Sequence, residues 1–210
     1  MIFNKVGFHL FKDYDLNAVL EESTEKIKKE IENDVKSNLP KNNDDYVKNQ
    51  IKKHKILPIE FQFDKISVSV EEQMIPANLF PFNYAVDSGN SYPKEVLSFH
   101  LPFSGDADLL KCRPSSRIMW TEEILVDNGE IIFDVIKFND SADEIKKTKE
   151  SFVNNLKQQA GSVNNQIIQF NDNLEKKLAE IIKSSEKKVD ESSKFLEDLG
   201  VALKKDNQNE

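Results

Sequence analysis

Arginine is the residue whose use stands out, because only two of the 29 cationic residues are arginines. Arg113 and Arg117 lie four residues apart, and Trp120, the one tryptophan, follows them. A guanidinium is a planar fork that can bind a carboxylate or phosphate through two bonds, unlike an ammonium group. This segment, with Asp106 nearby, is therefore a candidate site for such a group, or for a partner anchored by Trp120. The alternative, which we favour, is that the arginines hold loop carbonyls and an acid, Asp106 or Asp108.

A second pattern has the residue types of a metal-dependent nuclease. Asp134, Glu144 and Lys146 form an Asp…Glu-x-Lys string. Such enzymes need these groups on neighbouring strands that converge on a cation. Here we expect Glu144 to cap a helix and Lys146 to lie on that helix. We therefore assign no catalytic residue to this string.

Other sources of chemistry are not evident in the sequence. The three histidines lie far apart, a single cysteine offers no metal-binding cluster, and the six glycines form no phosphate-binding loop. We interpret His100, which alternates with apolar neighbours, as structural. We expect no metal and no cofactor.

Composition limits the class of protein further. A net charge of −8 is unsuited to coating nucleic acid, although local nucleic-acid contacts stay open. The first residues do not resemble a signal peptide, and no apolar run is long enough to span a bilayer. We expect a cytoplasmic protein with no membrane contact.

The positions of the apolar residues predict helices first and strands afterwards. Residues 15–55 have helical spacing, with Asp15 as the cap and a break around Pro40. Residues 57–139 change to alternation, in 59–63 and 66–70, and predict half-buried strands. Asn128-Gly129 between two apolar runs predicts a tight hairpin.

A long helical arm follows at residues 140–200. Ser141 and Glu144 form a capping box, and Gly200 is a suitable C-terminal stop. Its narrow apolar seam is coiled-coil-like and needs a partner, which could be the chain itself after folding back at Gly161-Ser162, a second copy, or another protein. The seam consists of Phe152, Leu156, Val163, Ile167, Phe170, Leu174, Leu178 and Ile181.

The expected fold class is α+β. An antiparallel β body with N-terminal helices occupies residues 1–139, the arm occupies 140–200, and residues 201–210 are expected to be a disordered tail.

One segment resembles a known group of proteins. Residues 98–106, Ser-Phe-His-Leu-Pro-Phe-Ser-Gly-Asp, precede Leu109-Leu110 and Arg113-Pro114-Ser115. With Phe170-Asn171 and Leu199-Gly200, they resemble the region that precedes the nuclease in uncharacterised bacterial restriction-endonuclease-like anti-phage proteins. The resemblance implies a scaffold or sensor without the enzyme, acting with a separate effector.

We therefore expect a non-enzymatic interaction protein that assembles with itself or with a separately encoded effector. The alternative is a nucleic-acid-binding subunit of a nuclease-type enzyme, with Arg113 and Arg117 contacting phosphate.

Overall fold

The computed structural model describes residues 7–37, 44–139 and 141–200. The chain divides into two compact units, Met1–Val19 with Leu57–Ile168, and Leu20–Ile56 with Gln169–Glu210. This division differs from the expected one, because α1 (Leu16–Lys36) and α3 (Ala142–Asp172) each contribute to both units. The break around Pro40 and the expected tail lie outside the described residues.

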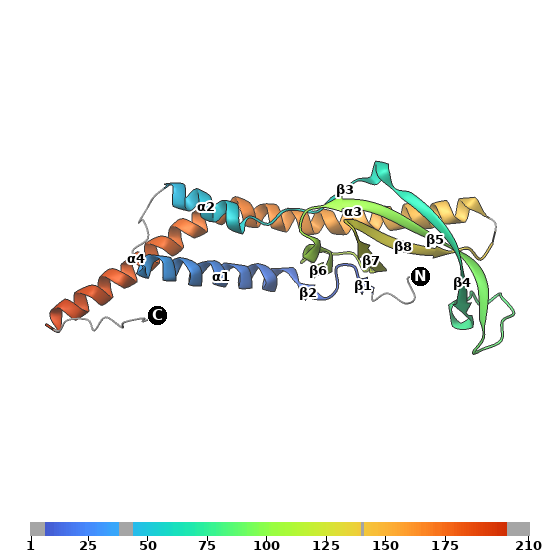
Figure 1. The fold of residues 1–210 in the computed structure, drawn as a ribbon, viewed down its shortest axis with the longest axis horizontal. Coiled ribbons are helices and arrows are strands. Elements are labelled where there is room, and N and C mark those ends of the chain that lie inside the picture. Colours follow the sequence, from blue (N-terminus) through green and yellow to red (C-terminus); the bar gives the residue numbers. More distant parts are fainter. Residues whose placement is uncertain (1–6, 38–43, 140, 201–210) are drawn as a thin grey trace, which may run out of the picture. The chain divides into compact units, whose positions relative to one another are not determined.

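The first unit is built around a curved antiparallel sheet (Figure 1). The strand order is β1-β7-β8-β5-β3, and β4 pairs with β5 as well. A separate parallel pair joins β2 to β6. The strands are β1 (Phe8–His9), β2 (Tyr14–Asp15), β3 (Glu60–Phe61), β4 (Ser67–Pro76), β5 (Ser91–Ser104), β6 (Cys112–Arg113), β7 (Glu123–Asp127) and β8 (Glu130–Ile136).

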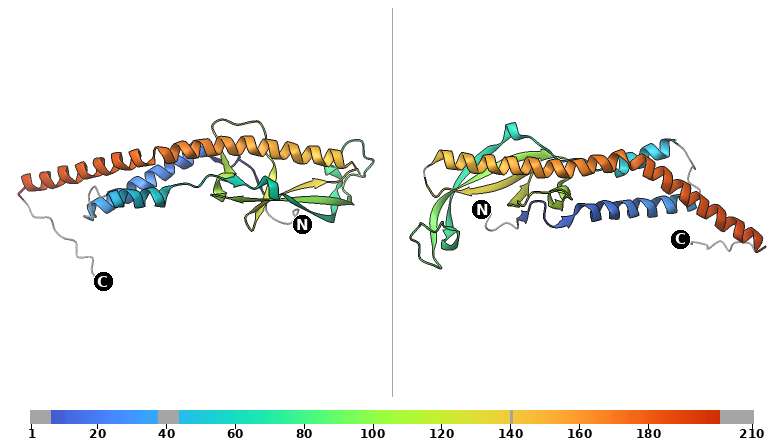
Figure 2. Two further views of the ribbon diagram at one scale, coloured as in Figure 1. Left: turned by 90° about the horizontal axis from the view of Figure 1, so that it is seen from above. Right: turned by 180° about the vertical axis from the view of Figure 1, so that it is seen from behind.

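Residues 142–168 of α3 lie along one face of this sheet (Figure 2). The rings of Phe99, Phe133 and Phe152 form a stacked column from β5 through β8 to the helix, with centroid distances of 5.1 and 3.6 Å. All three rings are buried, and their burial stabilises the packing of α3 on the sheet. This packing identifies the α3-facing side of every strand paired with β5 or β8.

The predicted hairpin turn is confirmed, whereas the predicted capping box is present only in its Ser141 half. Asn128 and Gly129 have φ values of 49° and 79° and connect β7 to β8, as a type I′ hairpin requires. At the start of α3, the Glu144 N–H donates to Ser141 Oγ over 3.3 Å. The Glu144 carboxylate accepts from Asn139 Nδ2 over 2.6 Å, and the Ser141 N–H donates to Asn139 Oδ1 over 2.9 Å instead of to Glu144.

The second unit is a bundle of helices with its own core. Residues 20–36 of α1 pack with α2 (Asp44–His54), the end of α3, and α4 (Leu174–Asp198). A salt bridge from Lys188 to Glu32, of 2.9 Å, joins α4 to α1, and Tyr46 donates to Asp34 over 2.7 Å. The buried core residues are Ile27, Ile31, Val35, Phe170, Leu174, Leu178 and Ile182.

Folding back of the arm at Gly161-Ser162 is wrong. Helix α3 continues through both residues and ends at Asp172, and α4 begins at Leu174. Close packing does not require a glycine at position 161, since an added Cβ would meet no atom within 4 Å. None of the described helices combines the length and apolar character that crossing a bilayer requires.

The predicted strands differ in length and burial from the expectation. The alternation in 59–63 yields only the two-residue strand β3, because Phe63–Lys65 forms a 3-10 turn. The alternation in 66–70 becomes the ten-residue β4, but its valines are exposed and not half-buried.

Amide side chains of α3 bind the backbone of neighbouring irregular segments. Within the first unit, Asn164 accepts from the Ile59 N–H at 2.9 Å and donates to its carbonyl at 2.7 Å. Within the second, Asn171 bonds Ile56 in the same way, at 3.1 and 2.8 Å. A carboxamide has one acceptor and two donors, so it can pair with a peptide group as a second strand would. These pairs explain part of the asparagine and glutamine content of the arm.

Replacing Asn164 by alanine should therefore destabilise the protein. The Ile59 N–H and C=O would lose their protein partner at a residue that is 2% exposed, at a cost of about 1–3 kcal/mol. The exposed neighbour Asn165 is the matched control, and Asn165→Ala should change the free energy of unfolding by at most about 0.5 kcal/mol. Urea unfolding measures both. Equal effects would contradict the role of the Asn164 pair.

A second prediction concerns Gly105, which ends β5 with φ +97°. A Cβ there would lie 2.0 Å from the Pro58 carbonyl oxygen, whereas a Cβ at Gly89, with φ +87°, would meet nothing within 4 Å. Both alanine variants carry the conformational cost of about 1–2 kcal/mol. Gly105→Ala should cost about 1–3 kcal/mol more, since Pro58 must move. Similar unfolding midpoints for the two variants would disprove the close contact.

Candidate functional site

Strand β4 is the most open element of the sheet. Among the described strands it pairs only with β5, so one edge of its ten residues has no strand beside it (Figure 1). Only Ile75 is buried along it. Backbone N–H and C=O groups alternate between the two edges of a strand, so β4 presents a row of both to its open side.

The side chains of β4 add an apolar surface to this edge. Val68 lies opposite Phe99 and Val70 opposite Leu97, so both face the α3 side of the sheet, as does Met74. Their exposed fractions are 50%, 54% and 60%. The apolar side chains on this face of β4 are therefore not covered by other residues, which is unusual for a strand of this length.

The opposite face of β4 is polar and tied to its neighbours. Ser69 Oγ lies 3.0 Å from His100 Nε2, and His100 Nδ1 lies 3.4 Å from a Glu130 carboxylate oxygen. Ser69, His100 and Glu130 thus have the order of the nucleophile, the base and the acid in a catalytic triad. However, Ser69 lies on an exposed strand and the contact from His100 to Glu130 is long. We interpret the group as a polar connection across β4, β5 and β8, which agrees with a structural role for His100.

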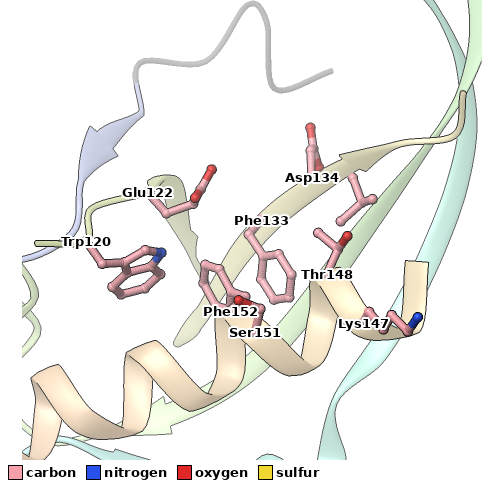
Figure 3. Close-up of a pocket in the computed structure, with 9 residues that line it drawn as sticks. Trp120, Glu122, Phe133, Asp134, Lys147, Thr148, Ser151 and Phe152 are labelled. Atoms are coloured by element: carbon pink, nitrogen blue, oxygen red, sulfur yellow. The ribbon is translucent and has the colours of Figure 1, made fainter. Parts of the chain in front are cut away.

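A cleft of about 370 Å³ is lined by β8, by the first turns of α3 and by the segment that precedes β7 (Figure 3). Trp120 meets Phe152 edge-on at a centroid distance of 5.5 Å and forms one wall. Asp134 and Glu122 point away from the aromatic rings, and Lys147 lies at the helix end of the cleft. Because carboxylates and an ammonium group are both present, the lining does not favour ligands of one charge.

Two carboxyl groups of this cleft have shifted pKa values. Burial raises the pKa of Asp134; the hydrogen bond from Ser98, at 2.7 Å, opposes the shift, and the charge of Glu71 adds to it. Asp134 Oδ2 is buried without a hydrogen-bond partner among the described residues. Desolvation also raises the pKa of Glu122.

The residues singled out in the arginine segment do not form one site. Arg113 lies 3.5 Å from Asp15, so the acid beside it is neither Asp106 nor Asp108. Asp106 instead caps the short helix Ala107–Lys111, accepting from the Asp108 N–H at 3.1 Å. Arg117 is exposed. Trp120 packs on α3 at the cleft.

The nuclease-like string and the single cysteine have ordinary structural surroundings. Glu144 takes part in the helix cap, and Asp134 lies on a strand. Within residues 7–37, 44–139 and 141–200, no group of three or more His, Cys, Asp or Glu side chains could hold a metal ion. Burial raises the pKa of the Cys112 thiol to about 11, which disfavours the reactive thiolate.

The apolar seam of the arm is covered within the chain. One part is buried in the first unit and another in the second, where Ile181 packs against the core. The structure thus favours an intramolecular partner for the seam, without a hairpin of the arm. The seam residues buried in the first unit are Phe152, Leu156, Val163 and Ile167, and those in the second are Phe170, Leu174 and Leu178.

Sequence reasoning missed the open edge of β4. The alternation of Ser67 to Val70 predicted the strand correctly but not which face would be covered. The adjacent pair Glu71-Glu72 was the available signal, because charges in the middle of a strand are typical of exposed edges.

The raised pKa of Asp134 predicts a pH-dependent effect of Asp134→Asn. The native state retains this proton above pH 3.8, the ordinary pKa, so the stabilising contribution is complete below that pH and is lost as pH rises through the folded value. The variant lacks this loss. Its free energy of unfolding should therefore rise relative to that of the native chain as the pH increases above about 4. Urea unfolding across this range tests it, and a constant difference would contradict it.

No family model, curated protein or solved structure matches this chain. The resemblance to the region preceding the nuclease in anti-phage proteins therefore stays a prediction.

Proposed function

We propose that this chain is an interaction protein that binds an extended segment of another polypeptide along β4. The observation that carries the proposal is the open edge of this ten-residue strand, with Val68, Val70 and Met74 exposed on one face. A docked segment would add a strand to the sheet. With the resemblance noted above, the proposed setting is a bacterial anti-phage assembly in which the effector is a separate protein.

The physical basis is the cost of leaving such an edge unused. Natural sheets protect long edges with charged side chains, above all lysine, and with proline or bulges, because exposed backbone groups pair with other chains. Strand β4 carries Glu71 and Glu72 at its middle but contains no lysine, and its one proline, Pro76, is its last residue. A docked segment would satisfy the outward N–H and C=O groups and cover the two valines, and both contributions favour binding.

The arm is a weaker candidate for the contact. Its seam residues are already covered in the cores of the two units, so little of the stripe remains for a second protein. The proposed contact surface is therefore β4. The alternative of a nucleic-acid-binding nuclease subunit gains no specific observation, because Arg113 pairs with Asp15 and Glu144 with a helix cap.

Selection of peptides on the intact chain tests the proposal. A phage-displayed library of random ten-residue peptides is selected on the full chain, and amide hydrogen exchange is measured with and without synthetic copies of the selected peptides. We expect selected peptides to slow exchange in Ser67–Pro76, because outward N–H groups become hydrogen-bonded.

Substitutions on β4 provide the matched comparison. Val68→Thr with Val70→Thr keeps β-branched side chains but removes apolar contact, and should weaken binding about tenfold. Val126→Thr is the control, since Val126 is an exposed valine on the same face of β7, opposite Ile131. Peptides that bind without protecting β4, or that bind equally to all variants, would disprove docking at this edge.

A further inference from the structure

The charges at the middle of β4 are acidic on both faces. Glu71 and Glu72 are consecutive, so one points to each side of the sheet, and the strand has no cationic residue. Glu72 lies directly opposite Glu95 of β5 on the α3 face. On the other face, the charge of Glu71 reaches Asp134. Each face therefore presents negative charge at the centre of the open edge.

Part of this charge is balanced within the sheet. Lys137 pairs with Glu95 at 2.6 Å, and Lys94 lies over the rings of Phe80 and Tyr84. Lys94 lies on β5 and Lys137 directly follows β8, so both belong to the paired side of β4 and not to its open edge. Glu71 and Glu72 are the two charged residues of β4 and stand at its middle.

The same charges oppose pairing of β4 with a second copy. A two-fold axis perpendicular to the sheet keeps each residue on its own face, and directly opposed residues must share a face. The longest antiparallel registers that satisfy both conditions are centred on Glu71 or on Glu72. In the first, Glu71 faces its own copy, and in the second Glu72 does. Like charges directly opposite are destabilising, so this edge is better suited to a different partner.

We infer that the segment which docks on β4 belongs to a different polypeptide and carries two consecutive basic residues opposite Glu72 and Glu71. This inference rests on the proposed docking function. If the docked segment runs antiparallel to β4, the residue directly after the basic pair lies opposite Val70. The residue two places further along lies opposite Val68. The residue two places before the pair's first member faces Met74.

The recognised pattern is thus apolar, any, basic, basic, apolar, any, apolar. The two unspecified positions lie opposite Gln73 and Ser69, where polar residues suit the surface. Opposite charges and apolar pairs across two strands each contribute about 0.2–1 kcal/mol. The basic pair should therefore change affinity by about tenfold.

Two capped, fluorescently labelled peptides test the inference on the full chain. One is Val-Thr-Lys-Lys-Val-Thr-Val, and the other replaces Lys-Lys by Glu-Glu. Fluorescence anisotropy should show about tenfold tighter binding of the basic peptide to the native chain. The double variant Glu71→Lys with Glu72→Lys should reverse this preference, because the pairs across the strands then become favourable for the acidic peptide.

A control separates local pairing from overall charge. Glu175→Lys with Glu180→Lys changes the net charge by the same amount at exposed positions of α4. This control should retain the native preference. If it reverses the preference as the β4 variant does, the effect is long-range attraction and the inference fails.

The library selection distinguishes failure of the inference from failure of the proposed function. Selected peptides that protect Ser67–Pro76 from exchange but lack a basic pair would overturn the inference and leave the docking function intact. Peptides that never protect β4 would overturn the docking function itself. Protection by peptides with the basic pair, lost in the Glu71→Lys and Glu72→Lys double variant, supports both.

Discussion

The pairing of carboxamide side chains with backbone peptide groups is the interaction on which the irregular parts of this structure depend. Gln159 bonds both backbone groups of Ile118 at 3.3 Å, and Asn164 does the same for Ile59. Gln166 accepts from the Ser115 N–H at 2.9 Å. In the second unit Asn171 holds Ile56. Segments without a strand partner must satisfy their peptide groups in another way, and the helix provides it.

Such contacts give structural roles to several of the residues that carry the resemblance to the anti-phage proteins. Gly105 allows the end of β5 to approach Pro58, Asp106 caps a short helix, and Ser115 is bonded to α3. Phe170 lies in a core while its neighbour Asn171 binds a backbone segment. Such residues are constrained by packing, so their presence alone does not identify a catalytic site. The proposed docking surface is the edge of β4, which none of these contacts covers among the described residues.

Features encoded by a few adjacent residues were predicted well. Asp15 accepts from the Asn17 N–H at the start of α1, Ser141 caps α3, and Asn128-Gly129 turns the hairpin. The sequence left open whether the arm folds back at Gly161-Ser162, because glycine lowers helix propensity, whereas the buried neighbours Ala160 and Val163 stabilise a helix that continues through it. The exposed valines of β4 were also missed, since alternation specifies two faces without specifying what covers them.

The sequence by itself determined the helices, the hairpin and the apolar seam of the arm, because these depend on interactions between residues close in the chain. It also excluded familiar catalytic motifs. Only the tertiary structure decided that the seam is covered within the two units, that Arg113 pairs with Asp15, and that β4 has an open edge. Each of these depends on residues distant in sequence. Spacing along one segment cannot specify which distant segment will lie against it, because that choice is made by the packing of the whole core.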